Sequence, residues 1–177
     1  MKRVIVLGSG GSGKSTFARR LGEITGLEVV HLDSVFWRPN WERTPKDEWE
    51  ETVKELAGRD SWIMDGNFGG TRELRLRACD TAILLDLPRY LCIYRVLKRA
   101  IVYRGKSRPD MAPGCNEKMD LEFFLWVWRY RKRGRLRALE QLKRAQDKRI
   151  IILRSKSDVE KFLTDLEEKW KSNETGL

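Results

Sequence analysis

Residues 8–15, Gly-Ser-Gly-Gly-Ser-Gly-Lys-Ser, match the pattern G-x4-G-K-[ST] at every fixed position. A short apolar run, Val4–Leu7, precedes them, and a segment of helical character, Lys14–Leu21, follows. Glycines in such a loop let backbone N–H groups converge on a phosphate at a helix N-terminus. Average residue usage would produce the fixed positions by chance in on the order of one chain in 200 of this length. The sequence therefore predicts a nucleotide-binding P-loop.

Each residue of this loop has an expected role toward ATP. The Lys14 ammonium is expected to reach the β- and γ-phosphates, and the Ser15 hydroxyl is expected to bind Mg²⁺. The predicted cofactors are therefore ATP and Mg²⁺. The other loop residues are expected to surround the phosphates: Gly8, Ser9, Gly10, Gly11, Ser12, Gly13 and Thr16.

Five short apolar runs rich in Val, Ile and Leu lack the polar alternation of half-exposed strands, which is typical of strands covered on both faces. Helical segments separate them, so the pattern indicates an α/β domain with a parallel sheet. With 177 residues, 41% of them hydrophobic, the chain is expected to form a single domain over residues 1–177. The runs are Val4–Leu7, Glu28–Leu32, Ser61–Met64, Thr81–Leu85 and Arg149–Leu153.

Prolines and capping residues mark the expected helix starts. Pro45 and Pro88 stand where two helices should begin. The segment Ser157-Asp158-Val159-Glu160 is interpreted as a capping box for the last helix. A long helical segment, roughly 117–146, carries apolar residues first and basic residues later. Helical spacing within it favours a core-facing stripe made of Leu121, Phe124, Leu125 and Trp128.

Acidic residues follow the apolar runs, at the edge of a parallel sheet where ligands bind. Asp33 and Asp65 end the second and third runs, and each is a candidate to hold Mg²⁺ through water. Asp86 ends the fourth run but stands just before Pro88, so it is interpreted as a helix cap rather than a metal ligand. His31 lies inside an apolar run and is interpreted as a packed structural residue.

The net charge of +10 is concentrated in residues 129–149, which hold ten Lys or Arg against two acidic residues. Such a surface suits polyanions, including nucleotides and nucleic acid, but it is equally expected of a solvated helix face. In a nucleic-acid-binding protein, Trp126, Trp128 and Tyr130 would stack on bases between the arginines. Without such a role, any nucleic-acid binding should be weak and salt-sensitive.

Cysteine usage and hydropathy exclude several classes of protein. The cysteines are widely spaced, with no Cys-x-x-Cys pair, which argues against a disulfide framework or a cysteine zinc site. No apolar run is long enough for a signal segment or a membrane span. The sequence therefore predicts a cytoplasmic protein with no membrane partner. The cysteines are Cys79, Cys92 and Cys115.

Over nearly its whole length the chain resembles the adenylate-kinase-like group of P-loop kinases, and more narrowly the bacterial DNA topology modulation protein family. This resemblance implies a three-layer α/β/α P-loop NTPase fold with a five-stranded parallel sheet in order 2-3-1-4-5. It also implies a lid and helical region over approximately residues 104–147. The matching stretches are His31-Leu32-Asp33-x3-Trp37, Asp65-Gly66-Asn67-Phe68, Leu85-Asp86-Leu87-Pro88 and Arg104-Gly105-Lys106-x-Arg108-Pro109-Asp110.

The same resemblance implies roles for individual residues. Asp65 would be a second-shell Mg²⁺ ligand, and Asp33 would orient or deprotonate the acceptor. Arg104 and Arg108 would be lid arginines on the phosphates, and Arg99 would stack on the adenine. The acceptor pocket would be formed or closed by Trp37, Arg38, Gly66, Asn67 and Arg72.

Two functions follow as alternatives. The first is an ATP-dependent kinase that transfers the γ-phosphate to a small hydroxyl or phosphate acceptor. The second is a nucleotide-dependent regulator that binds nucleic acid through its basic segment. Asp33 favours the kinase, because a plain binding module does not require a proton acceptor near the γ-phosphate. Asn67-Phe68 replace the Phe-Pro-Arg that helps adenylate kinases fix AMP, so AMP is not the expected acceptor.

Overall fold

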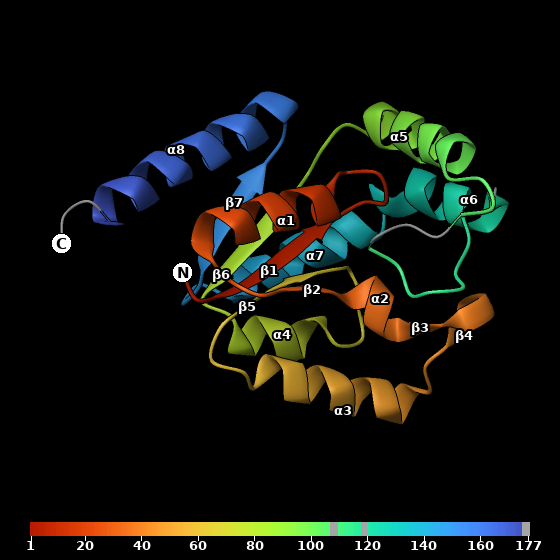
Figure 1. Cartoon of the computed structure of the whole chain (residues 1–177), viewed down its shortest axis with the longest axis horizontal. Coiled ribbons are helices and arrows are strands. Elements are labelled where there is room, and N and C mark those ends of the chain that lie inside the picture. The colour runs from red at the N-terminus through yellow and green to blue at the C-terminus, as the bar shows by residue number, and fades with distance from the viewer. Residues whose placement is uncertain (107–109, 118–119, 175–177) are drawn as a thin grey trace.

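The computed structural model of the chain describes residues 1–106, 110–117 and 120–174 (Figure 1). Its sheet has five parallel strands, which are β1 (Arg3–Gly8), β2 (Val29–His31), β5 (Trp62–Asp65), β6 (Thr81–Leu85) and β7 (Arg149–Leu153). The order across the sheet is β2-β5-β1-β6-β7. Because β3 (Trp37–Arg38) and β4 (Glu42–Arg43) form a separate hairpin, this is the predicted order 2-3-1-4-5.

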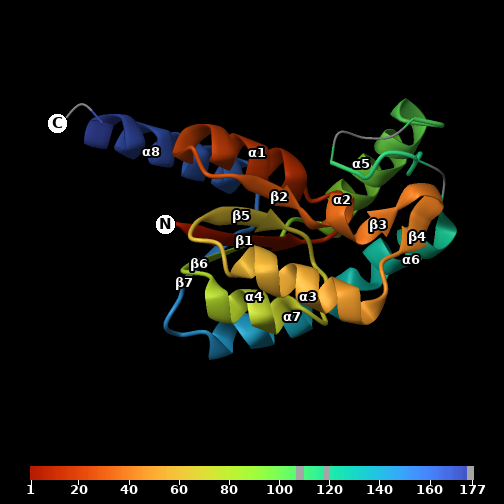
Figure 2. The same ribbon diagram turned by 60° about the horizontal axis from the view of Figure 1, so that its bottom comes forward.

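Helices cover both faces of the sheet and make three layers (Figure 2). One face carries α1 (Lys14–Thr25) and α8 (Lys156–Glu174); the other carries α3 (Lys46–Ala57), α4 (Arg72–Ala78) and α7 (Gly134–Arg144). The predicted α/β/α sandwich is thereby confirmed. The remaining helices are α2 (Leu32–Phe36), α5 (Arg89–Val102) and α6 (Leu121–Tyr130).

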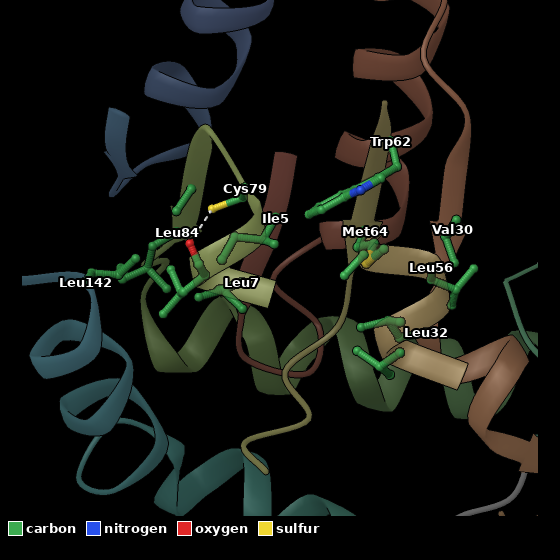
Figure 3. Packing of buried hydrophobic residues seen from close by; sticks show 14 of the residues in the cluster. Ile5, Leu7, Val30, Leu32, Leu56, Trp62, Met64, Cys79, Leu84 and Leu142 are labelled. Atoms are coloured by element: carbon green, nitrogen blue, oxygen red, sulfur yellow. Dashed lines mark hydrogen bonds between the residues drawn. The ribbon is translucent and has the colours of Figure 1, made fainter. Parts of the chain in front are cut away.

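Two apolar clusters hold the layers together. Along β1, Val4 and Val6 join the cluster under α1 and α8, whereas Ile5 and Leu7 join the cluster under α3, α4 and α7 (Figure 3). All four side chains are fully buried. A central parallel strand therefore needs apolar residues at every position, which is why its sequence shows no alternation.

The last helix begins earlier than the sequence pattern indicated. Ser155 Oγ accepts the N–H of Asp158 at 3.0 Å, and Asp158 Oδ2 accepts the N–H of Ser155 at 3.1 Å. The capping box is therefore Ser155–Asp158, and the prediction for Ser157–Glu160 was wrong. Since β7 ends at Leu153, only two residues remain for the turn before Lys156 enters the helix.

The expected core-facing stripe of the basic segment was also wrong. Leu121, Leu125 and Trp128 are exposed on α6. The buried residues of the helix are instead Val127 and Tyr130, because α6 packs against α5 and the P-loop.

The predicted long helical segment is split at residues 131–133 into α6 and α7. Leu142 of α7 belongs to the main core under the sheet. Within the expected lid region, Phe123 and Val127 of α6 pack against Gly10 of the P-loop.

The described cysteines agree with the expectation from their spacing. Cys79, Cys92 and Cys115 are buried and free of disulfides. Across the residues that the structure describes, every helix is too short or too polar to cross a bilayer.

Candidate active site

A pocket of about 780 Å³ lies beyond the carboxyl ends of the strands. The P-loop and the start of α1 form its floor. Asp33, after β2, and Asn67, after β5, line one side, and α5 and α6 line the other. The loop residues that border it are Gly10, Gly11, Gly13, Lys14, Ser15 and Thr16.

Within the P-loop, the side chain of Lys14 turns back toward the loop backbone. Lys14 Nζ donates to the carbonyl oxygen of Ser9 at 3.1 Å, which folds the side chain back over the loop. Burial lowers the pKa of Lys14, and the carboxylates of Asp65 and Asp33 oppose that shift. At Gly11, where φ is +75°, a Cβ would collide with the carbonyl of Cys92 in α5. The loop therefore needs glycine there to accept both its turn and the helix packed against it.

The carboxylate of Asp65 lies directly beside the P-loop serine. Ser15 Oγ donates to Asp65 Oδ2 at 2.9 Å, and His31 Nδ1 lies 2.6 Å from Asp65 Oδ1. The hydrogen bond with Asp65 raises the pKa of His31. Asp65 is thus held in place from both oxygens. His31 has a structural task, which is to fix this carboxylate.

A buried arginine shapes the loop that follows Asp65. Arg75 of α4 is fully buried and donates to three successive carbonyls, those of Gly66 at 3.0 Å, Asn67 at 2.9 Å and Phe68 at 3.1 Å. Burial lowers its pKa to about 9, so the guanidinium remains charged at neutral pH. Sequence reasoning missed Arg75, because an arginine in a short charged helix resembles a solvated one.

Two arginines of α5 reach the pocket, one helical turn apart. Arg95 Nη1 donates to the carbonyl of Ser12 at 3.2 Å. Arg99 Nε donates to Glu117 Oε1 at 3.0 Å, and its guanidinium lies 5.4 Å from the ring centroid of Phe123. Arg99 was expected at the nucleotide, whereas Arg95 was missed. The i, i+4 spacing of the two arginines was the available signal.

Several predicted site residues lie outside this pocket. Arg38 is directed to solvent, where its Nη2 donates to both oxygens of Glu48 at 2.6 Å. Arg72 is buried against α7 and donates to Gln141 Oε1 at 2.8 Å. Arg104 is exposed, and its backbone forms a bridge with that of Glu117. Gly66 contributes its carbonyl to Arg75. Arg108 lies outside the described residues.

Asp86 is not a helix cap. Arg135 of α7 donates to it through both Nε and Nη2, at 2.6 and 2.8 Å. Pro88 itself is the N-cap of α5, with no side-chain hydrogen bond there. The carboxylate is therefore used to anchor α7 beside the end of β6.

Two surface segments meet over the pocket beside Trp37 and form its roof. One is the β3–β4 hairpin with its short 3-10 turn, Pro39–Trp41, and the other is residues 110–117. Trp41 Nε1 donates to the carbonyl of Asn116 at 3.0 Å, and Cys115 Sγ donates to that of Arg38 at 3.2 Å. Trp37 and Trp41, whose ring centroids are 5.5 Å apart, line the pocket beneath.

Known proteins resemble this chain in part of its sequence and in its fold. No family model matches the chain. Over 88 residues, the chain is 31% identical to the adenylate kinases of Thermotoga petrophila and Thermotoga maritima. That match covers 49% of this chain and 39% of each relative, so the chain spans about two fifths of their length.

Solved structures share the fold across nearly the whole chain. A shikimate kinase from Acinetobacter baumannii, in complex with shikimate, superposes with a TM-score of 0.61 at 17% identity, covering 98% of this chain and 94% of that one. A gluconokinase from Sinorhizobium meliloti gives 0.51 at 14% identity and 97% coverage of each chain. The chain therefore has the P-loop kinase fold. The narrower likeness to DNA topology modulation proteins stays a prediction.

Proposed function

We propose that this chain is an ATP-dependent kinase that transfers the γ-phosphoryl group to a hydroxyl of a small-molecule acceptor. The observation that carries this proposal is that Lys14 and Asp33 line one pocket together with two arginines of α5. Its volume, about 780 Å³, lies within the usual range for small-molecule sites. The structural neighbours described above are a shikimate kinase and a gluconokinase, which supports the same proposal.

The phosphates of ATP would lie on the P-loop. Phosphoryl transfer depends on positioning and on neutralising the charge of the migrating group. In the proposed complex, Lys14 and the loop N–H groups bind the phosphates from below. Arg95 and Arg99, which border the same pocket, approach them from α5. Arg99 would exchange its ion pair with Glu117 for the nucleotide.

The residues beside the loop suit Mg²⁺, which prefers oxygen ligands and retains waters. Ser15 Oγ and Asp65 Oδ2 supply such oxygens 2.9 Å apart, and His31 fixes the carboxylate. The described residues hold no group of three His, Cys, Asp or Glu side chains suited to a metal. In our proposal Ser15 and Asp65 therefore hold the ion together with phosphate oxygens. When bound, Mg²⁺ neutralises charge on the phosphates.

Asp33 would act on the acceptor. It follows β2 at the start of α2 and borders the pocket opposite the α5 arginines. A carboxylate there can orient the acceptor hydroxyl and take its proton as the phosphoryl group transfers. Trp37 and Phe68 form an apolar wall beside it.

The positions of the aromatic residues do not support the nucleic-acid-binding alternative. Tyr130 is buried, and its OH lies 3.5 Å from Asn67 Oδ1. Trp126 stacks on Phe123 at the pocket. Trp128 is 49% exposed, and the guanidinium of Arg89 lies over its ring, 4.9 Å from the centroid. These side chains do not form one stacking platform.

The proposed function is tested by ATP consumption with sets of nucleosides, nucleotides, sugars and hydroxy acids, beside a reaction without acceptor. We expect ADP release that depends on one acceptor class and on Lys14. Tight Mg·ATP binding without acceptor-dependent turnover in any class would contradict a kinase of small molecules.

A further inference from the structure

Helix α5 presents a row of apolar side chains to solvent. Tyr90 is 76% exposed, Tyr94 61%, Leu97 37% and Ile101 70%. These four residues are called the α5 stripe below. Large apolar side chains gathered on one surface are uncommon in monomers and mark interaction sites. Neither the P-loop nor the pocket uses them.

The α5 stripe has the geometry of a helix-packing seam. Its members are spaced by four, three and four residues, so at about 100° per residue they lie within an arc of roughly 60°. The buried residues of the helix, Cys92, Val96 and Ala100, lie on another face, against α6 and the P-loop. Alternating steps of three and four are typical of helices that pair along a narrow apolar seam.

The charged residues of α5 lie outside the α5 stripe. The helix has four cations and no acidic residue. Three of the cations are engaged within the molecule: Arg89 over Trp128, Arg95 at Ser12 and Arg99 at Glu117. Lys98 is the remaining cation and is exposed. A polyanion or an acidic membrane would need more positive charge at this surface than one lysine.

We propose that the α5 stripe pairs with the same stripe of a second copy of this chain. The four-three-four spacing is symmetric about a point between Tyr94 and Leu97. An antiparallel pair of α5 helices therefore sets Tyr94 against Leu97 and Tyr90 against Ile101, in both directions. This is the self-complementary arrangement that a two-fold symmetric interface requires. The same register sets Lys98 opposite Ile93 rather than opposite another cation.

The interface lies on the helix that carries two pocket residues. Arg95 and Arg99 leave α5 on the side of the P-loop, whereas the stripe leaves it toward solvent. The second copy can therefore cover the stripe without entering the pocket. Association of two copies is measured without an activity assay. A chain that does not associate would therefore leave the proposed kinase function untouched.

The first test is molar mass by light scattering over a range of concentrations, at moderate salt because of the net charge. We expect a concentration-dependent dimer for the wild type and a monomer for Tyr94→Glu. Leu136→Glu is the matched control, because it charges an exposed apolar residue of α7 and should remain dimeric. Circular dichroism checks that both variants are folded. A wild type that stays monomeric, or a Tyr94→Glu dimer, would overturn the proposal.

The second test fixes the register by disulfide formation. A tagged Tyr90→Cys chain mixed with an Ile101→Cys chain should cross-link to it. Tyr90→Cys alone should not, because the two copies of residue 90 would lie about 16 Å apart along the helices. The native cysteines are buried, which keeps the background low. Self-cross-linking of Tyr90→Cys would show parallel pairing and would overturn the antiparallel assignment.

Discussion

The side-chain amide of Asn67 binds both backbone groups of Gly8, the residue that opens the P-loop. Asn67 Nδ2 donates to the carbonyl oxygen of Gly8 at 2.6 Å, and Asn67 Oδ1 accepts its N–H at 3.3 Å. Gly8 is buried at the end of β1. One side chain thus joins the loop after β5, which carries Asp65, to the loop that carries Lys14.

Replacing Asn67 by Ala should loosen this junction. The substitution removes one hydrogen-bond partner from each of two buried backbone groups of Gly8, so the free energy of unfolding should fall by about 1–3 kcal/mol. Affinity for Mg·ATP should weaken as well. Urea unfolding and calorimetry measure the two effects. Gln146→Ala, which removes an exposed amide, should change neither. Equal stability of the two variants would show that the junction contributes nothing.

Replacing Lys14 by Ala should abolish Mg·ATP binding or turnover while the fold survives. Lys14 Nζ donates to the carbonyl oxygen of Ser9 within the P-loop. In the proposed complex, the same ammonium would bind the phosphates. Calorimetry on the folded variant measures the loss. Unchanged affinity together with unchanged turnover would remove the basis for a phosphate site here.

Replacing Asp33 by Asn should lower turnover and leave the affinity for ATP almost unchanged. As the proposed proton acceptor, Asp33 should account for roughly 10²–10⁴-fold of turnover, the usual effect of a general base. Affinity for ATP should barely change. Asp60→Asn, at an exposed position, is the control. If ATP affinity collapses while turnover at saturation stays near wild type, Asp33 is a metal or structural residue.

Alkaline pH should destabilise the protein through Cys79. Burial raises the pKa of this thiol from 9.0 to about 11, in a core where it donates to the Leu76 carbonyl at 3.3 Å (Figure 3). Between those values the unfolded chain releases a proton that the folded chain keeps, so stability falls as pH rises. The loss should be roughly 2–3 kcal/mol. Urea unfolding of Cys79→Ala should show a shallower fall between pH 9 and 11 than the wild type; parallel curves would contradict it.

Nucleic-acid binding through the basic segment should be weak and without ATP dependence. Residues 129–149 would give it a steep salt dependence, because each neutralised phosphate releases counterions. Affinities for DNA and RNA, titrated with salt with and without Mg·ATP, measure this. Tight, ATP-modulated binding near 150 mM salt, roughly the physiological value, would support the regulator instead. Joint replacement of Arg131, Lys132 and Arg133 by Ala should leave ATP turnover within a few-fold of wild type.

The sheet could be predicted because its strands contain uninterrupted runs of apolar residues. Strands buried on both faces contain apolar residues at every position, as Val4 to Leu7 do, and the bounds of each of the five runs agree with those of its strand to within one residue at each end. The P-loop was predictable because the spacing of its glycines and lysine fixes its geometry. The nearness of Asp65 to Ser15 follows from parallel strands ending at one edge of the sheet.

Which face of a helix near the pocket is buried could not be predicted in the same way. In α6, Leu121, Leu125 and Trp128 have helical spacing, and so do Phe123, Val127 and Tyr130. Spacing alone cannot choose between them. The choice comes from a distant glycine: a Cβ at Gly10 would lie 2.7 Å from Phe123 Cζ and 2.8 Å from Val127 Cγ2. Contacts between residues so far apart in the chain leave no local pattern.

The roof of the pocket has a consequence for how a substrate would reach the proposed active site. Its segments, residues 37–43 and 110–117, hold one another through exposed or partly buried hydrogen bonds. Met111, Ala112 and Cys115 form a small cluster of their own with Trp37 and Trp41, separate from the two sheet clusters. These contacts include neither helix α1, which begins at Lys14, nor strand β5, which ends at Asp65. In the proposed kinase, an acceptor would therefore enter and leave past these few contacts, without a change in the hydrogen bonds of Lys14 and Asp65.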